Sequence, residues 1–278
     1  MRFGFHVSVA EGIHLAVDRA LERRCRTFQV FSSSPRTWRT RQVRSAEAAA
    51  FRAKVEQSQL APVVFHAPYL VNLGSGDSTI YEKSLAVMKH GARLADELGV
   101  RLFGFHVGNF RTSERERALD RVAGAVTEIL RESEEVVVLL ENSSGGGTSL
   151  GSTYEELATV LNRIEPASRA GVCFDTAHAF AAGYDLRTAA ALEKTLMEFD
   201  KIVGLHRLML IHANDSKYDL GTNRDRHEDI GQGFIGIEGF QAIVNHRRLK
   251  ELPCILETPG LLEDDSKNLE VIEGLVAD

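Results

Sequence analysis

Histidine, aspartate or glutamate ends each of six successive apolar runs in this sequence. The six residues are, in chain order, His66, His106, Glu141, Asp175, His212 and Glu257. A carboxylate at the end of a run such as VVVLLE or CILE is costly to remove from water unless it is paired or bound to a cation. Six such residues at equivalent positions therefore predict a shared counter-charge, which a cluster of metal ions would supply.

Two short pairs add further side chains that bind metals. Asp175-x-x-His178 begins at the end of one run, and Asp225-x-His227 lies between two others. The combined set of five histidines and four carboxylates exceeds the needs of one tetrahedral zinc ion and suits two or three ions if a carboxylate bridges. Imidazole-rich ligation favours Zn²⁺ or Mn²⁺ over Mg²⁺ and Ca²⁺. We expect zinc, and we assign no ligand role to His6 or to the remaining four histidines.

Eight apolar runs must position these side chains. They resemble buried strands and lie at 3–8, 27–31, 63–66, 102–106, 136–141, 171–175, 208–212 and 254–257. Helical segments alternate with them, and this alternation over about 250 residues is typical of a (β/α)8 barrel. We predict an α/β fold, a single-domain TIM barrel over residues 1–278, with its active site at the carboxyl-terminal rim of the strands. An open doubly wound sheet is the alternative, but no glycine-rich phosphate-binding turn follows the first run.

Three capping-box patterns predict where helices begin, because their side chains can bond the unpaired N–H groups of a first turn. The patterns are Thr79-x-x-Glu82, Ser113-x-x-Glu116 and Ser152-x-x-Glu155. Gly99 is placed to end the helix that the first pattern begins.

Composition narrows the class of protein. The chain has 33 Lys plus Arg against 39 Asp plus Glu, a net charge of -6, so a nucleic-acid partner would need local positive charge. The longest apolar run, 136–140, is too short to cross a membrane, and no signal-type segment opens the chain. Three cysteines without CxxC spacing fit a reducing compartment. We expect buried thiols in a cytoplasmic monomer with no membrane partner.

Eight segments of the chain resemble the endonuclease IV family, the zinc-dependent apurinic/apyrimidinic (AP) endonucleases of base-excision repair. They are GFHVSVAEG, FHAPYLVNLGS, FHVGN, LLENSSGGG, GVCFDTAHAFAAGYDLRT, IHANDSK, GTNRDRHEDIGQGFIG and ILETPG. The resemblance implies hydrolysis of the DNA phosphodiester 5′ of an abasic site, which leaves a 3′-hydroxyl and a 5′-deoxyribose phosphate.

The resemblance also implies a site of three zinc ions, with Mn²⁺ as an alternative in one or more positions. The first ion would be held by His66, His106 and Glu141, the second by Glu141, Asp175, His212 and Glu257, and the third by His178, Asp225 and His227. Glu141 would be the bridging catalytic carboxylate, and Glu257 would orient or deprotonate the attacking water.

Similarity to the family's loops implies that Arg36, Tyr69 and Leu70 insert into double-stranded DNA at the abasic site. Backbone-contacting or supporting roles are implied for Asn109, Asn142 and Lys217. The chain departs from the family pattern at Glu11 and Ser34, which lie in segments expected to face DNA. An acidic Glu11 is expected to weaken phosphate contact.

Two other functions stay open at this point. A divalent-metal sugar isomerase or epimerase on a similar barrel also uses strand-end Glu, Asp and His, but it needs only one or two ions and carboxylate-dominated ligation. A non-catalytic binder of damaged DNA would bind an abasic duplex without cutting it.

Overall fold

Eight parallel strands form the centre of the computed structural model, which describes residues 1–111, 113–259 and 265–277. They are β1 (Arg2–Phe5), β2 (Phe28–Phe31), β3 (Val63–His66), β4 (Leu102–His106), β5 (Val137–Glu141), β6 (Ala170–Asp175), β7 (Leu208–His212) and β10 (Pro253–Leu256). Their order in the sheet is β1-β10-β7-β6-β5-β4-β3-β2. The two ends of this order meet where His6 forms a parallel bridge with Gln29, and the Val7 N–H donates to the Gln29 carbonyl over 2.8 Å. The fold is a TIM barrel, as the alternation predicts.

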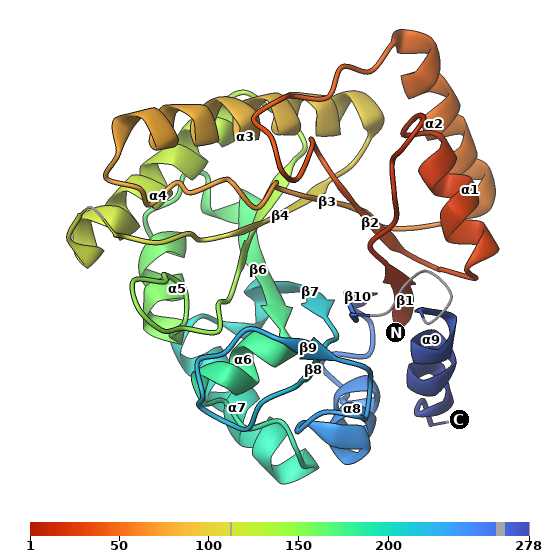
Figure 1. Ribbon diagram of the computed structural model, residues 1–278, viewed down its shortest axis with the longest axis vertical. Helices are drawn as coiled ribbons and strands as arrows, with labels where there is room; N and C mark the ends of the chain where they lie inside the picture. The colour runs from red at the N-terminus through yellow and green to blue at the C-terminus, as the bar shows by residue number, and fades with distance from the viewer. Residues whose placement is uncertain (112, 260–264, 278) are drawn as a thin grey trace.

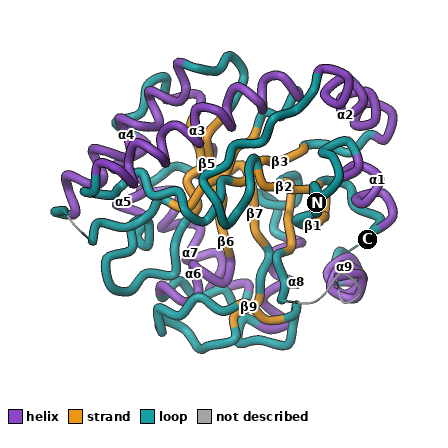
Figure 2. The backbone as a smooth tube through the Cα atoms, turned by 45° about the horizontal axis from the view of Figure 1, so that its top comes forward, coloured by secondary structure: helices purple, strands orange, loops and turns teal. Residues whose placement is uncertain are grey.

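Helices surround the strands (Figures 1 and 2). In the described residues they are α1 (Leu15–Glu22), α2 (Ser45–Ser58), α3 (Ser78–Leu98), α4 (Arg115–Arg131), α5 (Tyr154–Leu161), α6 (Thr176–Ala182), α7 (Ala189–Ile202), α8 (Gly236–Asn245) and α9 (Asp265–Gly274), with short 3-10 turns η1 (Ala167–Arg169) and η2 (Leu205–Arg207). The two longest described helices, α3 and α4, each bury one apolar stripe, which in α3 contains Met88, Ala92 and Ala95. The stripe explains why these segments are helical and dock on the barrel.

The helix starts differ from the predicted ones by one or two residues. The N-cap of α3 is Asp77, whose side chain accepts from the Thr79 and Ile80 N–H groups, so Thr79 lies inside the helix. The cap of α5 is Thr153, one residue after the expected Ser152. Ser, Thr and Asp are all favourable N-cap residues, so a sequence with several of them in a row does not specify the first residue.

The predicted start of α4 is wrong, whereas the predicted end of α3 is confirmed. The N-cap of α4 is Glu114, which makes no side-chain capping bond, so the predicted capping role of Ser113 is wrong. Gly99 does end α3: it adopts a left-handed conformation with φ of 71°, and its N–H donates to the last turn. That conformation is unfavourable for a residue with a Cβ, and this is why the glycine marks the end.

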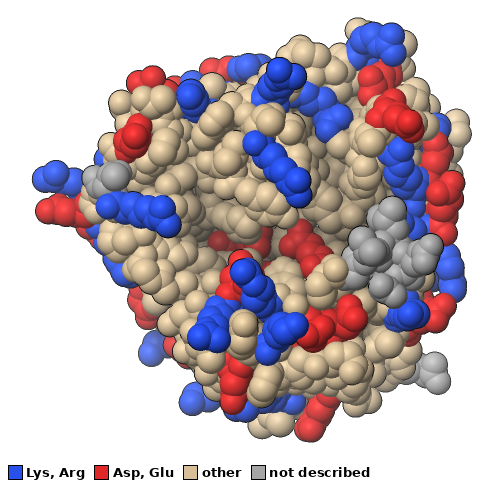
Figure 3. All heavy atoms as spheres, viewed as in Figure 1, with Lys and Arg blue, Asp and Glu red and all other residues tan. Residues whose placement is uncertain are grey.

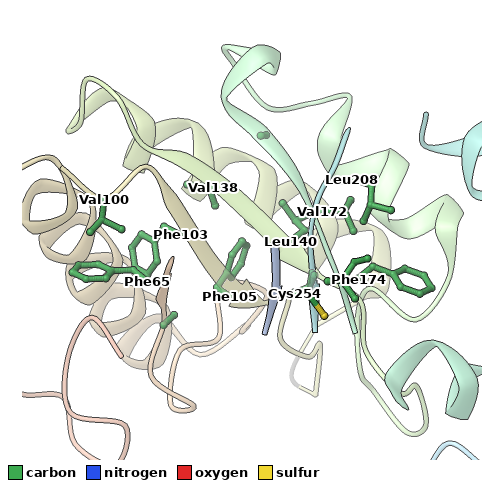
Figure 4. Close-up of a cluster of buried hydrophobic side chains, with 14 of the residues drawn as sticks. Phe65, Val100, Phe103, Phe105, Val138, Leu140, Val172, Phe174, Leu208 and Cys254 are labelled. Atoms are coloured by element: carbon green, nitrogen blue, oxygen red, sulfur yellow. The ribbon is translucent and has the colours of Figure 1, made fainter. Parts of the chain in front are cut away.

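Two apolar layers make up the core. The outer layer fills the space between strands and helices and includes Phe65, Phe103 and Phe105 (Figure 4). The inner layer comes from alternate positions of the same strands: Val64, Leu102, Val137, Leu139, Cys173, Leu210 and Ile255. All three cysteines are buried, as expected.

A two-stranded antiparallel sheet lies in the segment between β7 and α8, where no strand was predicted. It pairs β8 (Asp215–Ser216) with β9 (His227–Glu228). Strands of two residues have no hydrophobic period, so the sequence pattern does not reveal them. Among the described residues, no helix has the length and apolar character that crossing a membrane requires.

Candidate metal centre

The strand period of two decides which side chains reach the inside of the barrel. In β5, Val137 and Leu139 belong to the inner layer, whereas Val138 and Leu140 face the helices. Glu141 continues the inward series at the top of the strand. The same step of two joins an inner apolar residue to a strand-end side chain at Val64 and His66, Cys173 and Asp175, Leu210 and His212, and Ile255 and Glu257.

The first group comprises His66, His106 and Glu141, from three adjacent strands. Glu141 is completely buried, and its Oε2 lies 2.7 Å from His66 Nε2. Its other oxygen, Oε1, lies 3.2 Å from His106 Nε2. One ligand atom of each of the three residues lies within 4.8 Å of the others, a spacing that could hold a metal ion.

The second group comprises Glu141, Asp175, His212 and Glu257 and shares Glu141 with the first. His212 Nδ1 lies 3.6 Å from Glu141 Oε1, 3.3 Å from Glu257 Oε2 and 4.0 Å from Asp175 Oδ2. These four residues also have ligand atoms within 4.8 Å of one another. Glu141 is therefore placed to bridge two cations.

The third group comprises His178, Asp225 and His227. Asp225 Oδ1 lies 3.3 Å from His178 Nε2 and 3.6 Å from His227 Nε2. Asp175 reaches this group as well, since its Oδ2 lies 3.8 Å from His227 Nε2, and Asp175, His178 and His227 satisfy the same 4.8 Å spacing. The structure thus brings all nine predicted side chains together, with Asp175 between the second and third groups.

Hydrogen bonds to backbone carbonyl groups orient three of the histidine rings. The Nδ1 atoms of His66, His178 and His227 lie 2.9 Å from backbone carbonyl oxygens. A carbonyl only accepts, so each Nδ1 carries a proton and each ring presents its Nε2 to the cluster. Three buried atoms facing it, Glu141 Oε1, His212 Nδ1 and His227 Nε2, lack a hydrogen-bond partner in the described part of the chain. Such orphaned acceptors fit bound cations.

Opposite charges crowd this cluster. Burial acts to raise the pKa of Glu141, but neighbouring histidines, His106 first, outweigh it and hold that pKa well below its usual value. Burial acts to lower the pKa of His178, yet Asp175 and the other carboxylates raise it well above its usual value. The hydrogen bond from His178 lowers the pKa of Asp225 to about 2. Without a cation, protonated histidines balance the carboxylates, and a metal ion can take over that role.

Cys173 lies directly beneath the cluster. Its sulfur shares the 4.8 Å spacing with Glu141 and His212. Burial raises the pKa of the Cys173 thiol to about 12, so it stays protonated at neutral pH. A neutral thiol is a poor metal ligand, and the residue serves as part of the inner apolar layer.

Two cavities open above the cluster, with volumes of about 830 and 470 Å³. Both are lined by Tyr69, His106, His178 and Asp225, so they are two lobes of one cleft, which we call the large and the small lobe. Figure 3 shows a hollow in this face with acidic side chains at its floor and lysine and arginine side chains on its rims. The local charge that a nucleic-acid partner requires is therefore available around the cleft.

Tyr69 stands where the two lobes meet. Its side chain is 65% exposed, stacks on the His106 ring with 6.2 Å between centroids, and touches the Phe31 ring edge-on at 5.1 Å. Leu70 is 37% exposed and lines the large lobe together with Asn109. An exposed aromatic ring and leucine at the mouth of a polar cleft are suited to insertion into a base stack.

The remaining residues predicted to contact DNA lie elsewhere. Arg36 is exposed in the segment between β2 and α2, and Lys217 is exposed with Nζ 3.6 Å from Glu228 Oε2. Neither residue is among those that line the two lobes. Glu11 is also exposed, and its carboxylate lies 3.6 Å from Arg19 Nη2, which offsets part of the negative charge expected to repel phosphate.

Three buried polar residues support the cluster from outside. Asn142, for which a supporting role was one of two expectations, exchanges two hydrogen bonds with the Asp175 backbone. Asn214 was not predicted: it donates to Asp175 Oδ2 over 2.7 Å and accepts from the Glu257 N–H over 2.8 Å. Asp215 was also missed, and it accepts backbone N–H bonds from the segment after β9. A buried Asn-Asp pair directly after a strand is the signal that could have found them.

Gln29 and His6 also belong to the site, although neither was predicted. His6 lines the small lobe, and Gln29 is completely buried in β2 and hydrogen-bonds to His6, His212 and Glu257. A polar residue at an inward position of the apolar run FQVF is the sequence signal that marks Gln29.

Comparisons with known proteins agree with this geometry. The family model described as xylose isomerase-like TIM barrel matches residues 17–274. A probable endonuclease 4 of Methanoculleus marisnigri is 45% identical over 258 residues, which is 92% of each chain. An apurinic-apyrimidinic endonuclease of Caenorhabditis elegans is 38% identical over 92% of this chain and 65% of its own length.

Solved structures separate into near and distant matches. Endonuclease IV from Thermus thermophilus superimposes with a TM-score of 0.89 at 38% identity, over 99% of this chain and 98% of that one. A D-tagatose 3-epimerase-like protein matches with a TM-score of 0.76 at 20% identity, over 99% of this chain and 97% of that one. At that identity the second match supports the barrel fold alone.

Proposed function

This chain belongs to the endonuclease 4 family of xylose isomerase-like TIM barrels, and we propose that it is an AP endonuclease of base-excision repair. It hydrolyses the DNA phosphodiester 5′ of an abasic site and leaves a 3′-hydroxyl and a 5′-deoxyribose phosphate. The observation that carries the proposal is the convergence of nine histidine and carboxylate side chains beneath one open cleft. Its partner is double-stranded DNA that contains an abasic site.

The donor set suits three zinc ions, with manganese as the alternative in one or more positions. The first, second and third groups would each hold one ion, with Glu141 shared between the first two. Bound cations supply Lewis-acid activation of water and stabilise charge on the phosphate and the leaving oxygen. Three divalent ions also add six positive charges to the chain's net charge of -6, which brings the total to zero.

The two carboxylates Glu257 and Glu141 have different roles. Glu257 follows β10 at the small lobe, where its side chain is 23% exposed and reachable by water. We assign it the orientation or deprotonation of the attacking water. Glu141 is completely buried and cannot meet bulk water, so its role is to balance charge and fix distances within the cluster.

The loops would recognise the missing base. Tyr69 and Leu70 project at the cleft and would fill the gap left in the duplex, while the abasic sugar turns into a lobe beside them. Arg36 would insert from the segment outside the lobes, and Asn109 and Lys217 would contact the DNA backbone. We further propose that the protein acts as a cytoplasmic monomer.

The competing functions make different demands on the site. A sugar isomerase would leave the third group without a role, and analysis would find one Mn²⁺ or Mg²⁺ per chain rather than three ions. A non-catalytic binder would retain an abasic duplex uncut. The donor set of five histidines and the family membership favour the nuclease.

An incision assay tests the proposal. A duplex with one abasic site, labelled at the 5′ end of the damaged strand, should be cut to a product that a DNA polymerase can extend, since extension requires a 3′-hydroxyl. The same duplex without the abasic site is the matched control and should stay intact. A chelator should stop incision, and added zinc should restore it. Protein that carries three ions and leaves the abasic duplex uncut would refute the proposal.

Glu257→Gln separates binding from chemistry. The substitution keeps the shape of the side chain but removes its capacity to accept a proton, so abasic DNA should still bind while incision is lost. Unchanged incision would remove Glu257 from the mechanism.

A further inference from the structure

Gln29 connects three functional side chains at the edge of the proposed metal cluster. It lies in β2, and its side chain is completely buried. Its Oε1 lies 2.9 Å from His212 Nε2, and its Nε2 lies 2.7 Å from Glu257 Oε1 and 3.0 Å from His6 Nδ1. A single amide thus contacts a member of the second group, the carboxylate assigned to the attacking water, and a histidine of the small lobe.

The partners determine which way the amide points. The ionised Glu257 carboxylate only accepts hydrogen bonds, so it must face the NH2 group of Gln29. The carbonyl oxygen of Gln29 must then accept a hydrogen bond from the His212 Nε2–H group. In a neutral His212 ring the lone pair then lies on Nδ1, the atom that faces Glu141 and Glu257 and is otherwise without a partner among the described residues.

The same amide orients His6. Its NH2 group donates to His6 Nδ1, so the ring proton of a neutral His6 lies on Nε2. That Nε2 is buried and without a hydrogen-bond partner in the described residues, and His6 lines the small lobe. The ring also packs on Phe31, with 4.1 Å between centroids, which restricts its rotation.

We propose that Gln29 is a positioning residue, which fixes the Glu257 carboxylate and directs His212 Nδ1 at the second ion. The proposal rests on the proposed function, because it concerns the same cluster. Without Gln29, the Glu257 carboxylate would lose a charge-assisted hydrogen bond and His212 would lose the acceptor that selects its tautomer. Partners of this kind typically change metal affinity or activity by about 10- to 100-fold.

Direct metal measurements test the proposal without any DNA. Gln29→Met removes both polar atoms at similar length and volume. We expect its second zinc ion to bind about 10- to 100-fold more weakly in a competition with graded chelator, read as zinc per chain by mass spectrometry. Incision of abasic DNA should fall through kcat, with KM almost unchanged, because Gln29 lies beneath the substrate cleft and is buried from DNA.

Gln29→Glu tests the hydrogen bonds to His212 and Glu257 separately. It keeps an acceptor for His212 but places a carboxylate against Glu257, where the amide donated. We expect a kcat defect at least as large as that of Gln29→Met, because like charges then face each other at 2.7 Å. This second variant also keeps the test decisive if one of the two substitutions prevents folding.

Thr27→Val provides the matched control. Thr27 lies two residues earlier, is completely buried, and donates one side-chain hydrogen bond to the Pro62 carbonyl over 2.5 Å, away from the cluster. The substitution removes a buried hydrogen bond just before β2 and nearly keeps the shape of the side chain. We expect lower thermal stability with zinc affinity and kcat close to those of the parent chain.

The outcomes separate the two proposals. A folded Gln29→Met protein with parental zinc affinity would overturn the positioning role, and so would an equal loss of zinc in Thr27→Val. A parent chain that binds three ions but fails to cut abasic DNA would contradict the proposed function, while the zinc measurements would still judge Gln29. A parent chain that binds no ion would overturn both.

Discussion

The first and third groups differ in what holds their side chains. His66, His106 and Glu141 all end barrel strands, and Glu141 is completely buried. In the third group His178 belongs to the short helix α6 and Asp225 to the segment between β8 and β9, with 55% of its side chain exposed. The barrel itself builds the first group, whereas the third group depends on the conformation of one loop. Substitutions in the two groups should therefore have unequal consequences.

Glu141→Gln should have the largest effect. Glu141 faces both His66 and His106 and also His212, so neutralising it removes the charge shared by the first and second groups. We expect loss of more than one zinc ion per chain and a fall in incision beyond the roughly 100- to 1,000-fold that removal of one stabilising group costs in other enzymes. Circular dichroism is the control for folding. Three retained ions would contradict the bridging role.

Asp225→Asn should affect the third group alone. Two ions should remain, because Asp225 contacts only His178 and His227 in this cluster. In the parent chain, a graded chelator should likewise release one ion first, since this group is the more exposed one. Zinc released to a colorimetric dye measures both effects. Simultaneous release of all three ions would abolish the contrast between the two groups.

Asp215→Asn should weaken metal binding by the third group, although Asp215 is not one of its ligands. Asp215 is buried and accepts N–H bonds at 2.9 Å from Gly231 and Ile235 and at 3.0 Å from Gly233, which holds the segment after β9 in place. The side chain of asparagine has only one oxygen that accepts, and its NH2 group only donates, so it cannot accept all of these bonds. We expect about 10- to 100-fold weaker binding of the third ion by chelator competition. Asp219→Asn, in the same loop but exposed, is the matched control.

Zinc binding should release protons at neutral pH. In the metal-free chain, nearby carboxylates outweigh burial and raise the pKa of His178 well above its usual value, so this ring is protonated near pH 7. It must lose that proton to become a ligand, so zinc affinity should rise as pH increases from 6 towards 8. Titration calorimetry in buffers of different ionisation enthalpy measures the release. Affinity that is independent of pH would show that the ring is already neutral.

Arg36→Ala should have the smallest effect of the five. Arg36 is exposed and lies outside both lobes, so all three groups should keep their ions. Binding to an abasic duplex should weaken by about 5- to 10-fold, equivalent to about 1–1.4 kcal/mol. Fluorescence anisotropy with the labelled duplex measures this change. Unaltered binding would exclude Arg36 from the DNA contact.

The contrast between the first and third groups also explains which site residues the sequence can predict. The strand-end positions of His66, His106, Glu141 and His212 follow from apolar runs, because each run fixes both the strand and its inward side. Asp225 and His227 lie between β7 and α8, where no apolar run has such a period, and only their spacing and the family resemblance pointed to them. Their support by Asp215 is a tertiary arrangement that no local pattern encodes.

The other errors of the sequence prediction have two different causes. Gln29 was overlooked because a lone amide is not a metal ligand, and its three bonds reach residues up to 228 positions away in the chain. The α3 and α5 helices begin at Asp77 and Thr153, since neighbouring residues of similar capping strength compete for the same role.

The inner apolar layer has one further consequence. Five residues of this layer lie directly below the ligand side chains and close the barrel under them: Val64, Leu139, Cys173, Leu210 and Ile255. In the described part of the chain this layer closes the lower end of the barrel, so ions, solvent and chelators reach the ligands through the cleft that also faces the DNA. Bound DNA would cover this opening. Metal ions could then not leave while DNA is bound, and metal exchange would occur only between rounds of DNA binding.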